Sequence, residues 1–152
     1  MENKQYKDSM NMTEQIIKRS VDFVIATCCL IFFSPLAIAC AIAIRLEDGL
    51  PVIYRQERIG LHGKPFFIYK FRSMKIDAEK DGPDLLEIKG DPRLTKVGRF
   101  LRMHHLDELP QLWNVFKGDM AFVGPRPERK FYIDQIMEHD PRYTYLYQIR
   151  PG

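Results

Sequence analysis

A chain of 152 residues is long enough for one compact domain but not comfortably for two. With 45% hydrophobic and 28% charged residues, its composition excludes an intrinsically disordered protein. The net charge is only +3, and many of the 23 Lys and Arg residues flank one apolar run or lie near Gly and Pro turns. This distribution favours anionic lipid or phosphate partners and predicts no nucleic-acid binding.

The first predicted element is an uncharged apolar run from Phe23 to Ile44. As a helix rising about 1.5 Å per residue, it could just span a hydrocarbon core of roughly 30 Å. It is too long for a secretory signal and lacks a clean cleavage site, so we interpret it as a membrane anchor. Its three cysteines, Cys28, Cys29 and Cys40, are interpreted as apolar packing residues rather than metal ligands or disulfide partners, which favours a reducing cytosolic side.

The path of this anchor in the membrane is set by a central proline and by its flanks. Pro35 removes one backbone hydrogen bond and kinks or breaks a helix, and the Ser34 hydroxyl is one candidate partner for a freed carbonyl. Basic residues, which favour the cytoplasmic side, stand at both ends of the run. A re-entrant hairpin satisfies both flanks, whereas a single-pass helix with a mild kink remains the alternative. The basic flanking residues are Lys18, Arg19, Arg45, Arg55 and Arg58.

Asp22 stands at the entry to the anchor, three residues after Arg19. At helical spacing these two side chains can form an ion pair that ties the entry point to the membrane interface. The alternative is a solvated pair that contributes little.

A β-hairpin is predicted after the anchor. Val52 to Gln56 and the aromatic-rich segment Phe66 to Phe71 have strand character, and Gly60 and Gly63 between them give turn freedom. The acidic segment from Ile76 to Asp91 then has the composition of a mobile loop.

Helices are predicted in the second half of the chain. Thr95 is a plausible N-cap for a helix through about Met103. A second helix is expected from near Asp107 to about Phe116, with Pro110 tolerated in its first turn and Gly118 beyond its end.

A rigid turn at 124–127 should precede a helix from Glu128 to His139, whose residues Tyr132, Ile133, Ile136 and Met137 share one side. The tyrosines Tyr143, Tyr145 and Tyr147 that follow are either core or headgroup-level residues.

Asp107 and Glu108 are the pair most able to carry chemistry. Adjacent carboxylates repel each other, and a helix N-terminus compensates through its dipole and free N–H groups. The basic neighbours Arg99 and Arg102 can add to that compensation. The alternative is an ordinary acidic first helical turn.

Arg126 lies between Pro125 and Pro127, which fix two φ angles and so restrict where the arginine points. A rigid guanidinium suits bidentate contact with phosphate, although a surface arginine in a tight turn remains the alternative. Weaker candidate phosphate contacts are Lys70, Arg72, Arg93 and Arg99. Adjacent residues on a helix do not face each other, so His104 and His105 are not expected to be joint metal ligands.

Many short motifs together carry a resemblance to a known family. They are Lys18-Arg19 with Asp22, Ser34-Pro35, Pro51-Val52, Gln56, Arg58, Gly60, Gly63, 70–74, Asp91-Pro92-Arg93, Thr95, Gly98-Arg99, Leu101-Arg102, 106–112, Asn114-Val115, 118–120 and 123–127. Over roughly residues 16 to 152 the chain resembles the monotopic phosphoglycosyl transferases, or bacterial sugar transferases.

The resemblance implies an enzyme that transfers a sugar 1-phosphate from a UDP-sugar to polyprenyl (undecaprenyl) phosphate, releasing UMP. Such enzymes begin capsule, exopolysaccharide, O-antigen or glycoprotein glycan assembly. The family's dyad falls on Asp107, the nucleophile that becomes a phosphosugar adduct, and Glu108, which assists with proton transfer or metal positioning. Mg²⁺ (magnesium) is the implied cofactor, held at Asp107 and Glu108. Its proline–arginine–proline motif falls on Pro125, Arg126 and Pro127.

The implied fold is α+β and mostly helical, with a re-entrant membrane helix kinked at Ser34-Pro35, a small β-hairpin and catalytic helices at the membrane interface. The expected parts are a polar tail at 1–15, an anchor at 16–48 and a cytoplasmic catalytic domain at 49–152. The expected location is the bacterial inner membrane, with the active site facing the cytoplasm, and a homo-oligomer is possible.

The chain departs from the family pattern at two places. His105 stands where serine or threonine is common, and family members usually continue beyond Arg150-Pro151-Gly152. The expectation is therefore a C-terminally shortened form. Two alternatives to an enzyme remain: a catalytically incompetent membrane-anchored scaffold, and a single-pass protein with a cytosolic binding domain.

Overall fold

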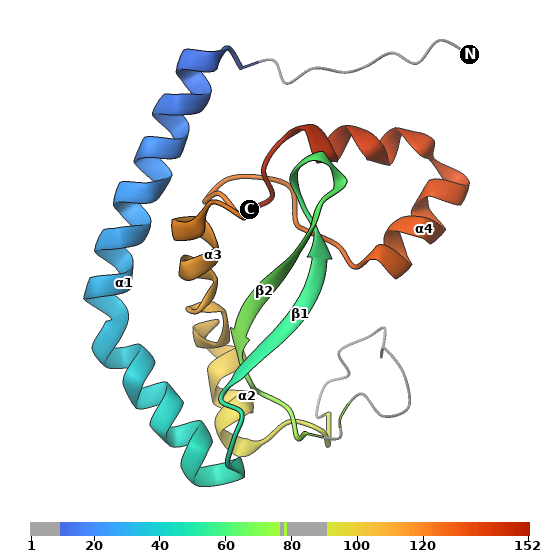
Figure 1. The fold of residues 1–152 in the computed structure, drawn as a ribbon. Helices are drawn as coiled ribbons and strands as arrows, with labels where there is room; N and C mark the ends of the chain where they lie inside the picture. The colour runs from blue at the N-terminus through green and yellow to red at the C-terminus, as the bar shows by residue number, and fades with distance from the viewer. Residues whose placement is uncertain (1–9, 77, 79–90) are drawn as a thin grey trace. The chain divides into compact units, whose positions relative to one another are not determined.

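The computed structural model describes residues 10–76, 78 and 91–152, and its fold is mostly helical with one two-stranded sheet (Figure 1). The helices and strands are α1 Met12–Asp48, β1 Ile53–Ile59, β2 Pro65–Phe71, α2 Lys96–Met103, α3 Gln111–Lys117 and α4 Lys130–His139. The 3₁₀ helices found in the described residues are η1 Leu61–Gly63, η2 Leu106–Glu108 and η3 Pro141–Gln148. Of the predicted acidic loop, residues 77 and 79–90 lie outside the described part of the chain.

The described residues fall into two compact units, which are treated separately below. Unit 1 takes its residues from Met1–Ile31, Arg55–Ile68 and Leu112–Gly152. Unit 2 consists of Phe32–Tyr54 and the described residues of Tyr69–Gln111. The predicted division at residues 15 and 48 is a division by membrane depth, so it remains a prediction.

Helix α1 is one continuous helix with Pro35 inside it. Its start is set by a reciprocal cap in which the Glu14 N–H donates to Asn11 Oδ1 at 2.9 Å and the Asn11 N–H donates to Glu14 Oε2 at 2.8 Å. The helix is long and apolar enough to cross a membrane, and only 11% of its most apolar 18 residues is buried within the structure. The re-entrant path stays a prediction.

The β-hairpin is confirmed. β2 begins one residue before the predicted Phe66, and β1 continues to Ile59, beyond the predicted Gln56. The turn closes with the Gly60 N–H donating to the Lys64 carbonyl at 2.9 Å. Gly63 has a φ of +71°, a conformation that glycine adopts without strain.

Unit 1 is organised around a small apolar core of Ala26, Ile68, Val115 and Met120. Arg19 reaches from α1 to the end of α3, where its Nη1 and Nη2 donate to the Val115 and Phe116 carbonyls at 2.7 and 2.6 Å. These carbonyls belong to the last turn of α3, where the Val115 carbonyl also accepts from the Gly118 N–H at 3.1 Å, and the arginine acts as a cap for both.

The predicted ion pair between Arg19 and Asp22 is therefore wrong. Asp22 pairs instead with Lys18, at 3.3 Å and i,i+4 spacing, because the end of α3 takes the Arg19 guanidinium. Asp22 is buried and also accepts from the Phe122 N–H at 3.4 Å. Ser34 and Pro35 lie inside α1, and the kink expected at this point stays a prediction.

The predicted helix from Asp107 to Phe116 is wrong at its start. The chain forms the short η2 turn at Leu106–Glu108, and α3 begins only at Gln111. Pro110 has no N–H with which to donate to the Leu106 carbonyl, which disfavours an α-helix across this point, and α3 begins at the next residue. Gly118 ends α3 with a φ of +95°, as expected from its position.

The remaining predicted helices are confirmed with small shifts. Thr95 is the N-cap of α2, and its Oγ1 accepts from the Gly98 N–H at 2.8 Å. Helix α4 begins at Lys130 rather than Glu128. In unit 2 the core is formed by Cys40, Ile44, Phe71 and Leu101.

The three cysteines are free thiols, and of the three Cys40 packs in the core of unit 2, whereas Cys28 is exposed.

Candidate active site

The two adjacent carboxylates lie on the η2 turn of unit 2, which follows α2. His105 precedes the turn with φ 54° and ψ 20°, a left-handed conformation that redirects the chain after α2. The Glu108 N–H returns to the His105 carbonyl at 3.3 Å. As a result Asp107 is buried, with 7% of its surface exposed, while Glu108 is only partly buried.

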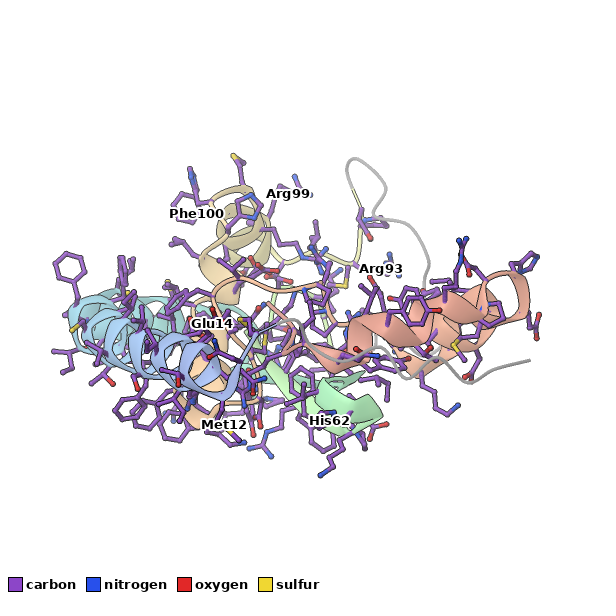
Figure 2. The ribbon with its side chains drawn as sticks, turned by 90° about the horizontal axis from the view of Figure 1, so that it is seen from above. Met12, Glu14, His62, Arg93, Arg99 and Phe100 are labelled. Atoms are coloured by element: carbon purple, nitrogen blue, oxygen red, sulfur yellow. The ribbon has the colours of Figure 1, made fainter. Side chains whose placement is uncertain are left out.

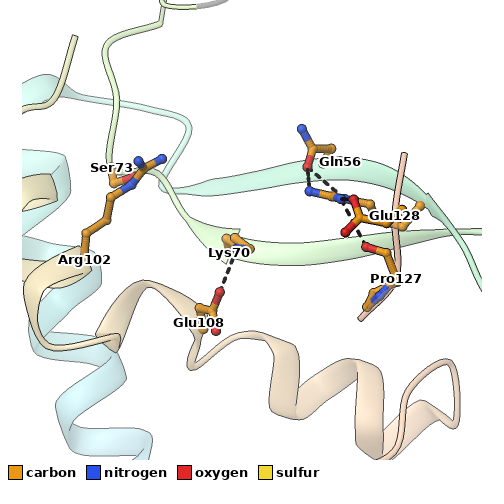
Figure 3. A network of polar contacts seen from close by, with 8 residues as sticks. Gln56, Lys70, Ser73, Arg102, Glu108, Pro127 and Glu128 are labelled. Carbon is orange, nitrogen blue, oxygen red and sulfur yellow. Dashed lines mark hydrogen bonds and ion pairs between the residues drawn. The ribbon is translucent and has the colours of Figure 1, made fainter. Parts of the chain in front are cut away.

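Glu108 is engaged by a lysine from the hairpin. Lys70 Nζ on β2 lies 2.8 Å from Glu108 Oε1, as Figure 3 shows. The two side chains are 21% and 39% exposed, so water screens the pair in part and its contribution to stability is small. Lys70 was predicted to be a phosphate contact, and its position at the dyad is compatible with that.

The electrostatic setting of Asp107 is a balance between burial and neighbouring charge. Burial raises the pKa of Asp107, the positive charges of Lys70 and Arg102 lower it, and the negative charge of Glu108 raises it further. The net direction is upward. The predicted α-helix N-terminus is absent here, so these two cations supply the compensation that the helix dipole was expected to give.

Helix α2 is held tightly against the chain that leaves β2. Arg102 Nε donates to Ser73 Oγ at 2.9 Å, and the Thr95 N–H donates to the Ser73 carbonyl at 3.1 Å. A Cβ on Gly98 would stand well inside 3.0 Å of three backbone atoms of Ser73. Only glycine permits this approach, which fixes the helix that leads into η2.

The C-terminal end of α1, which is part of unit 2, forms hydrogen bonds with α2 and with Arg72. Glu47 accepts from the Lys96 and Val97 N–H groups at 2.7 and 2.8 Å, so its carboxylate caps the first turn of α2. Arg72 is buried, lies 3.0 Å from the Asp48 carboxylate and donates to the Asp48 carbonyl at 2.7 Å. Arg72 was predicted to contact phosphate, and the structure instead places it against the C-terminal end of α1.

The other predicted cations of unit 2 are divided between pairing and exposure. Arg93 is paired through its side chain with the buried Asp91, whose Oδ1 also accepts from the Arg93 N–H at 2.9 Å. Arg99 is exposed and projects outward from α2 beside Phe100 (Figure 2). Of the predicted phosphate contacts in this unit, the structure brings Lys70 to the dyad.

The segment Pro125, Arg126 and Pro127 belongs to unit 1, between α3 and α4. It lines a small cavity, the rest of which is formed by Ile59, Gly60, Glu128, Ile133, Tyr143, Leu146, Tyr147, Ile149 and Pro151. The tyrosines come from η3, and their rings meet edge to face at a centroid distance of 6.3 Å. Tyr143 and Tyr147 therefore line the same cavity as Arg126, whereas Tyr145 is exposed and no residue of η3 is buried.

Sequence reasoning missed several residues that hold the site in place, among them Ser73, Glu47 and the Lys70–Glu108 pairing. Their partners are 29, 49 and 38 residues away in the chain. No local pattern signals such pairs. The sequence offered one clue, the segment 70–74, in which polar and basic residues lie at the end of a predicted strand.

A magnesium ion at Asp107 and Glu108 would be bound partly by these carboxylates and partly by the substrate. Mg²⁺ is usually held by one or two carboxylates together with phosphate oxygens and water. In the part of the chain that the structure describes, no group of three or more His, Cys, Asp or Glu side chains is arranged to hold a metal. Asp107 and Glu108 would hold a magnesium ion only together with phosphate oxygens and water, and Lys70 already engages one Glu108 oxygen, so the metal stays a prediction.

Comparison with known proteins assigns the chain to a family. A UDP-N-acetylgalactosamine-undecaprenyl-phosphate N-acetylgalactosaminephosphotransferase from Aeromonas hydrophila is 44% identical over 136 residues, which are 90% of this chain and 32% of that protein. A putative undecaprenyl-phosphate N-acetylgalactosaminyl 1-phosphate transferase from Bacillus subtilis is 48% identical, over 84% of this chain and 71% of that protein. A UDP-glucose:undecaprenyl-phosphate glucose-1-phosphate transferase from Caulobacter vibrioides is 46% identical, over 89% and 50%.

The chain thus spans between 32% and 71% of the length of these relatives. The family model of the bacterial sugar transferases matches residues 13–152, which is nearly the whole chain. On this match, the protein belongs to the bacterial sugar transferase family.

Proposed function

We propose that this protein transfers a sugar 1-phosphate from a UDP-sugar to undecaprenyl phosphate, giving a polyprenyl-diphospho-sugar and UMP. The observation that carries the proposal is the buried Asp107 carboxylate, adjacent in sequence to a Glu108 that is paired with Lys70. Relatives named for undecaprenyl-phosphate sugar phosphotransfer support the reaction class.

The proposed first step is nucleophilic attack by an Asp107 carboxylate oxygen on the β-phosphorus of the UDP-sugar. A new oxygen–phosphorus bond forms, the bond from that phosphorus to the bridging oxygen breaks, and UMP leaves with the bridging oxygen and its electron pair. In the second step a phosphate oxygen of the lipid attacks the same phosphorus and releases the Asp107 carboxylate. A covalent intermediate divides one difficult transfer into two easier ones.

The neighbouring charges have distinct parts in this proposal. Lys70 and Arg102 lower the pKa of Asp107 against its burial, and so favour the ionised form that attacks. Lys70 also holds Glu108, which would bind a metal or assist proton transfer. Magnesium, when bound, supplies neutralisation of phosphoryl charge. Arg126 is proposed to contact the nucleotide phosphates through its guanidinium fork.

The protein is proposed to be held in the bacterial inner membrane by α1, as a re-entrant anchor with both ends on the cytoplasmic side. The support is the long, exposed apolar surface of the helix, with Pro35 inside it and basic residues on both flanks. Accessibility labelling of single cysteines at Gln15 and Leu46, in a chain with the native cysteines replaced, tests the topology. Labelling of the two sites from opposite sides would sink the re-entrant path.

Mass spectrometry of the intact protein tests the chemistry directly. The chain, purified in lipid nanodiscs, is incubated with Mg²⁺ and one UDP-sugar at a time, without lipid phosphate. UDP-N-acetylgalactosamine and UDP-glucose are the first donors to try, because relatives are named for them. The expected product is a protein heavier by one phosphosugar, and the modification should lie on the peptide that contains Asp107. One UMP should be released for each protein molecule modified.

Matched variants separate the proposed chemistry from general damage. Asp107→Asn keeps the shape of the side chain and should give no adduct. Asp134→Asn changes an exposed carboxylate on α4, 60% exposed and paired with Lys130, and should behave as the unchanged protein. Adduct formation by Asp107→Asn, or sequential rather than ping-pong kinetics with lipid phosphate, would overturn the covalent mechanism. A folded chain that binds membranes but forms no adduct with any UDP-sugar favours a scaffold.

A further inference from the structure

The backbone around Arg126 is held from both sides by residues distant in the sequence. On the N-terminal side, the Gly152 N–H donates to the Pro125 carbonyl at 3.0 Å. On the C-terminal side, Arg58 Nη1 donates to the Pro127 carbonyl at 3.1 Å. Arg126 therefore lies between two carbonyls whose orientations are both fixed.

These two hydrogen bonds complete a restriction that the prolines only begin. Each proline ring fixes its own φ, and Arg126 is confined to extended conformations because it precedes Pro127. Neither proline fixes its own ψ, and the peptide planes could still rotate. A hydrogen bond to each proline carbonyl restricts that rotation, so the backbone segment that carries Arg126 is held at both of its ends.

Arg58 is itself oriented before it reaches the turn. Its Nε and Nη2 both donate to Gln56 Oε1, at 3.0 and 2.6 Å, and its Nη1 also lies 3.4 Å from Glu128 Oε2 (Figure 3). Gln56 and Arg58 are two residues apart on β1, so their side chains leave the same face of the strand. The Arg58 side chain is 15% exposed, which limits competition from water.

On the N-terminal side of the turn, the backbone of residues 121–125 is in close contact with residues 150–152. A Cβ on Gly124 would stand inside 3.0 Å of the Arg150 carbonyl oxygen and the Gly152 nitrogen. The Ala121 N–H donates to the Pro151 carbonyl at 2.7 Å. Residues 150–152 thus lie along residues 121–125 as a backbone support.

We propose that Arg58, aligned by Gln56, is a positioning residue for phosphate recognition by Arg126. This inference rests on the phosphate role of Arg126 in the proposed function. Arg58 keeps its guanidinium turned toward the Pro127 carbonyl and does not itself touch the nucleotide. Lysine cannot replace it, because a single ammonium cannot hold Gln56 and the Pro127 carbonyl in the same fork geometry.

UDP binding tests the inference without depending on turnover. Titration calorimetry in nanodiscs with Mg²⁺ compares the unchanged protein with Arg58→Lys, Arg126→Lys and the double variant. Each single variant should raise the Kd for UDP by about tenfold, a typical loss for one charged hydrogen bond. Because Arg58 acts only through Arg126, the double variant should bind about as weakly as Arg126→Lys alone.

Two further variants guard the interpretation. Gln56→Ala keeps Arg58 but removes the oxygen to which its Nε and Nη2 donate, so it should also raise the Kd for UDP. Arg142→Lys makes the same chemical change at an arginine 75% exposed on η3 and should leave the Kd unchanged. If Arg58→Lys lowers thermal stability too far for titration, the double-mutant cycle is measured with Gln56→Ala, Arg126→Lys and the two combined.

The inference is overturned if Arg58→Lys and Gln56→Ala bind UDP normally, or if the effects of positions 58 and 126 add in the double variant. It is also overturned if Arg126→Lys has no effect on UDP binding. None of these results touches Asp107, whose role is decided by the adduct experiment, so failure of one proposal is distinguishable from failure of the other.

Discussion

Replacing Asp107 by asparagine should abolish the transfer reaction and at the same time make the folded protein more stable at neutral pH. Asp107 is 7% exposed, and the net effect of its surroundings is to raise the pKa of its carboxyl, with burial as the largest cause. The ionised carboxylate is therefore less favourable in the folded chain than in the unfolded one. Asparagine keeps the shape without the charge, so it removes this penalty.

The expected gain in the free energy of unfolding is about 0.5–2 kcal/mol, the usual range for relieving a strained functional position. It is limited because Lys70 and Arg102 attract the carboxylate and offset part of the cost of its burial. For a chain of this size, 1 kcal/mol corresponds to roughly 2–4 °C in Tm.

The pH dependence gives this prediction its sign. A carboxyl whose pKa is raised on folding favours the folded state while protonated, and that advantage is lost as pH rises through the folded pKa. The Tm difference between Asp107→Asn and the unchanged protein should thus be near zero below about pH 3.9, the ordinary aspartate pKa, and should grow toward neutral pH.

Thermal unfolding in detergent micelles at several pH values measures the effect. Asp134→Asn is the control, because that carboxylate is 60% exposed and its removal should change the Tm little. An Asp107→Asn protein that is no more stable than the unchanged protein at pH 7, or a gain that is the same at pH 4 and pH 7, would refute the reasoning from burial.

Three further predictions follow from the fold. Gly98→Ala places a Cβ against the backbone of Ser73, so it should lower the free energy of unfolding by about 1–3 kcal/mol and impair adduct formation. An unchanged Tm would contradict this packing of α2 against Ser73. Burial raises the pKa of Glu47, but hydrogen bonds from the α2 N–H groups outweigh it and the net shift is downward. Glu47 is exposed and water screens the cap, so Glu47→Gln should lose only about 0.5 kcal/mol at neutral pH, a loss that disappears as acid protonates the native carboxylate. Equal urea midpoints at pH 7 would argue against the cap. Pro35→Ala should let some molecules span the membrane, which cysteine labelling would detect as sites of opposite sidedness, whereas an unaltered labelling pattern would show that the proline does not control the path.

Local elements were well predicted because their causes lie within a few residues. The hairpin follows from two strand-forming segments separated by glycines, and the start of α2 follows from Thr95 accepting a hydrogen bond three residues along the chain. The error among the predicted helices, a helix beginning at Asp107, came from treating Pro110 as a first-turn residue. The structure puts it before the helix, with α3 beginning at Gln111.

The sequence also determined which residues to examine at the site, but not what they touch. Adjacent carboxylates and an arginine between prolines are visible as patterns, and family resemblance assigned roles to them. Arg72 and Arg93, however, looked equivalent to Lys70 as candidate phosphate ligands. In the fold Arg72 and Arg93 are paired with Asp48 and Asp91, while Lys70 reaches Glu108.

The sequence by itself determined the long apolar helix, the hairpin, the Thr95 cap of α2 and the position of the dyad in the chain, since each depends on composition, periodicity or neighbours within one turn. Only the tertiary structure decided the burial of Asp107, the pairing of Lys70 with Glu108 and the hydrogen bond from Arg58 to the Pro127 carbonyl. The two side-chain contacts join residues 38 and 69 positions apart. Such contacts form because the folded backbone brings their atoms within hydrogen-bonding distance, and no local preference of the chain specifies that approach.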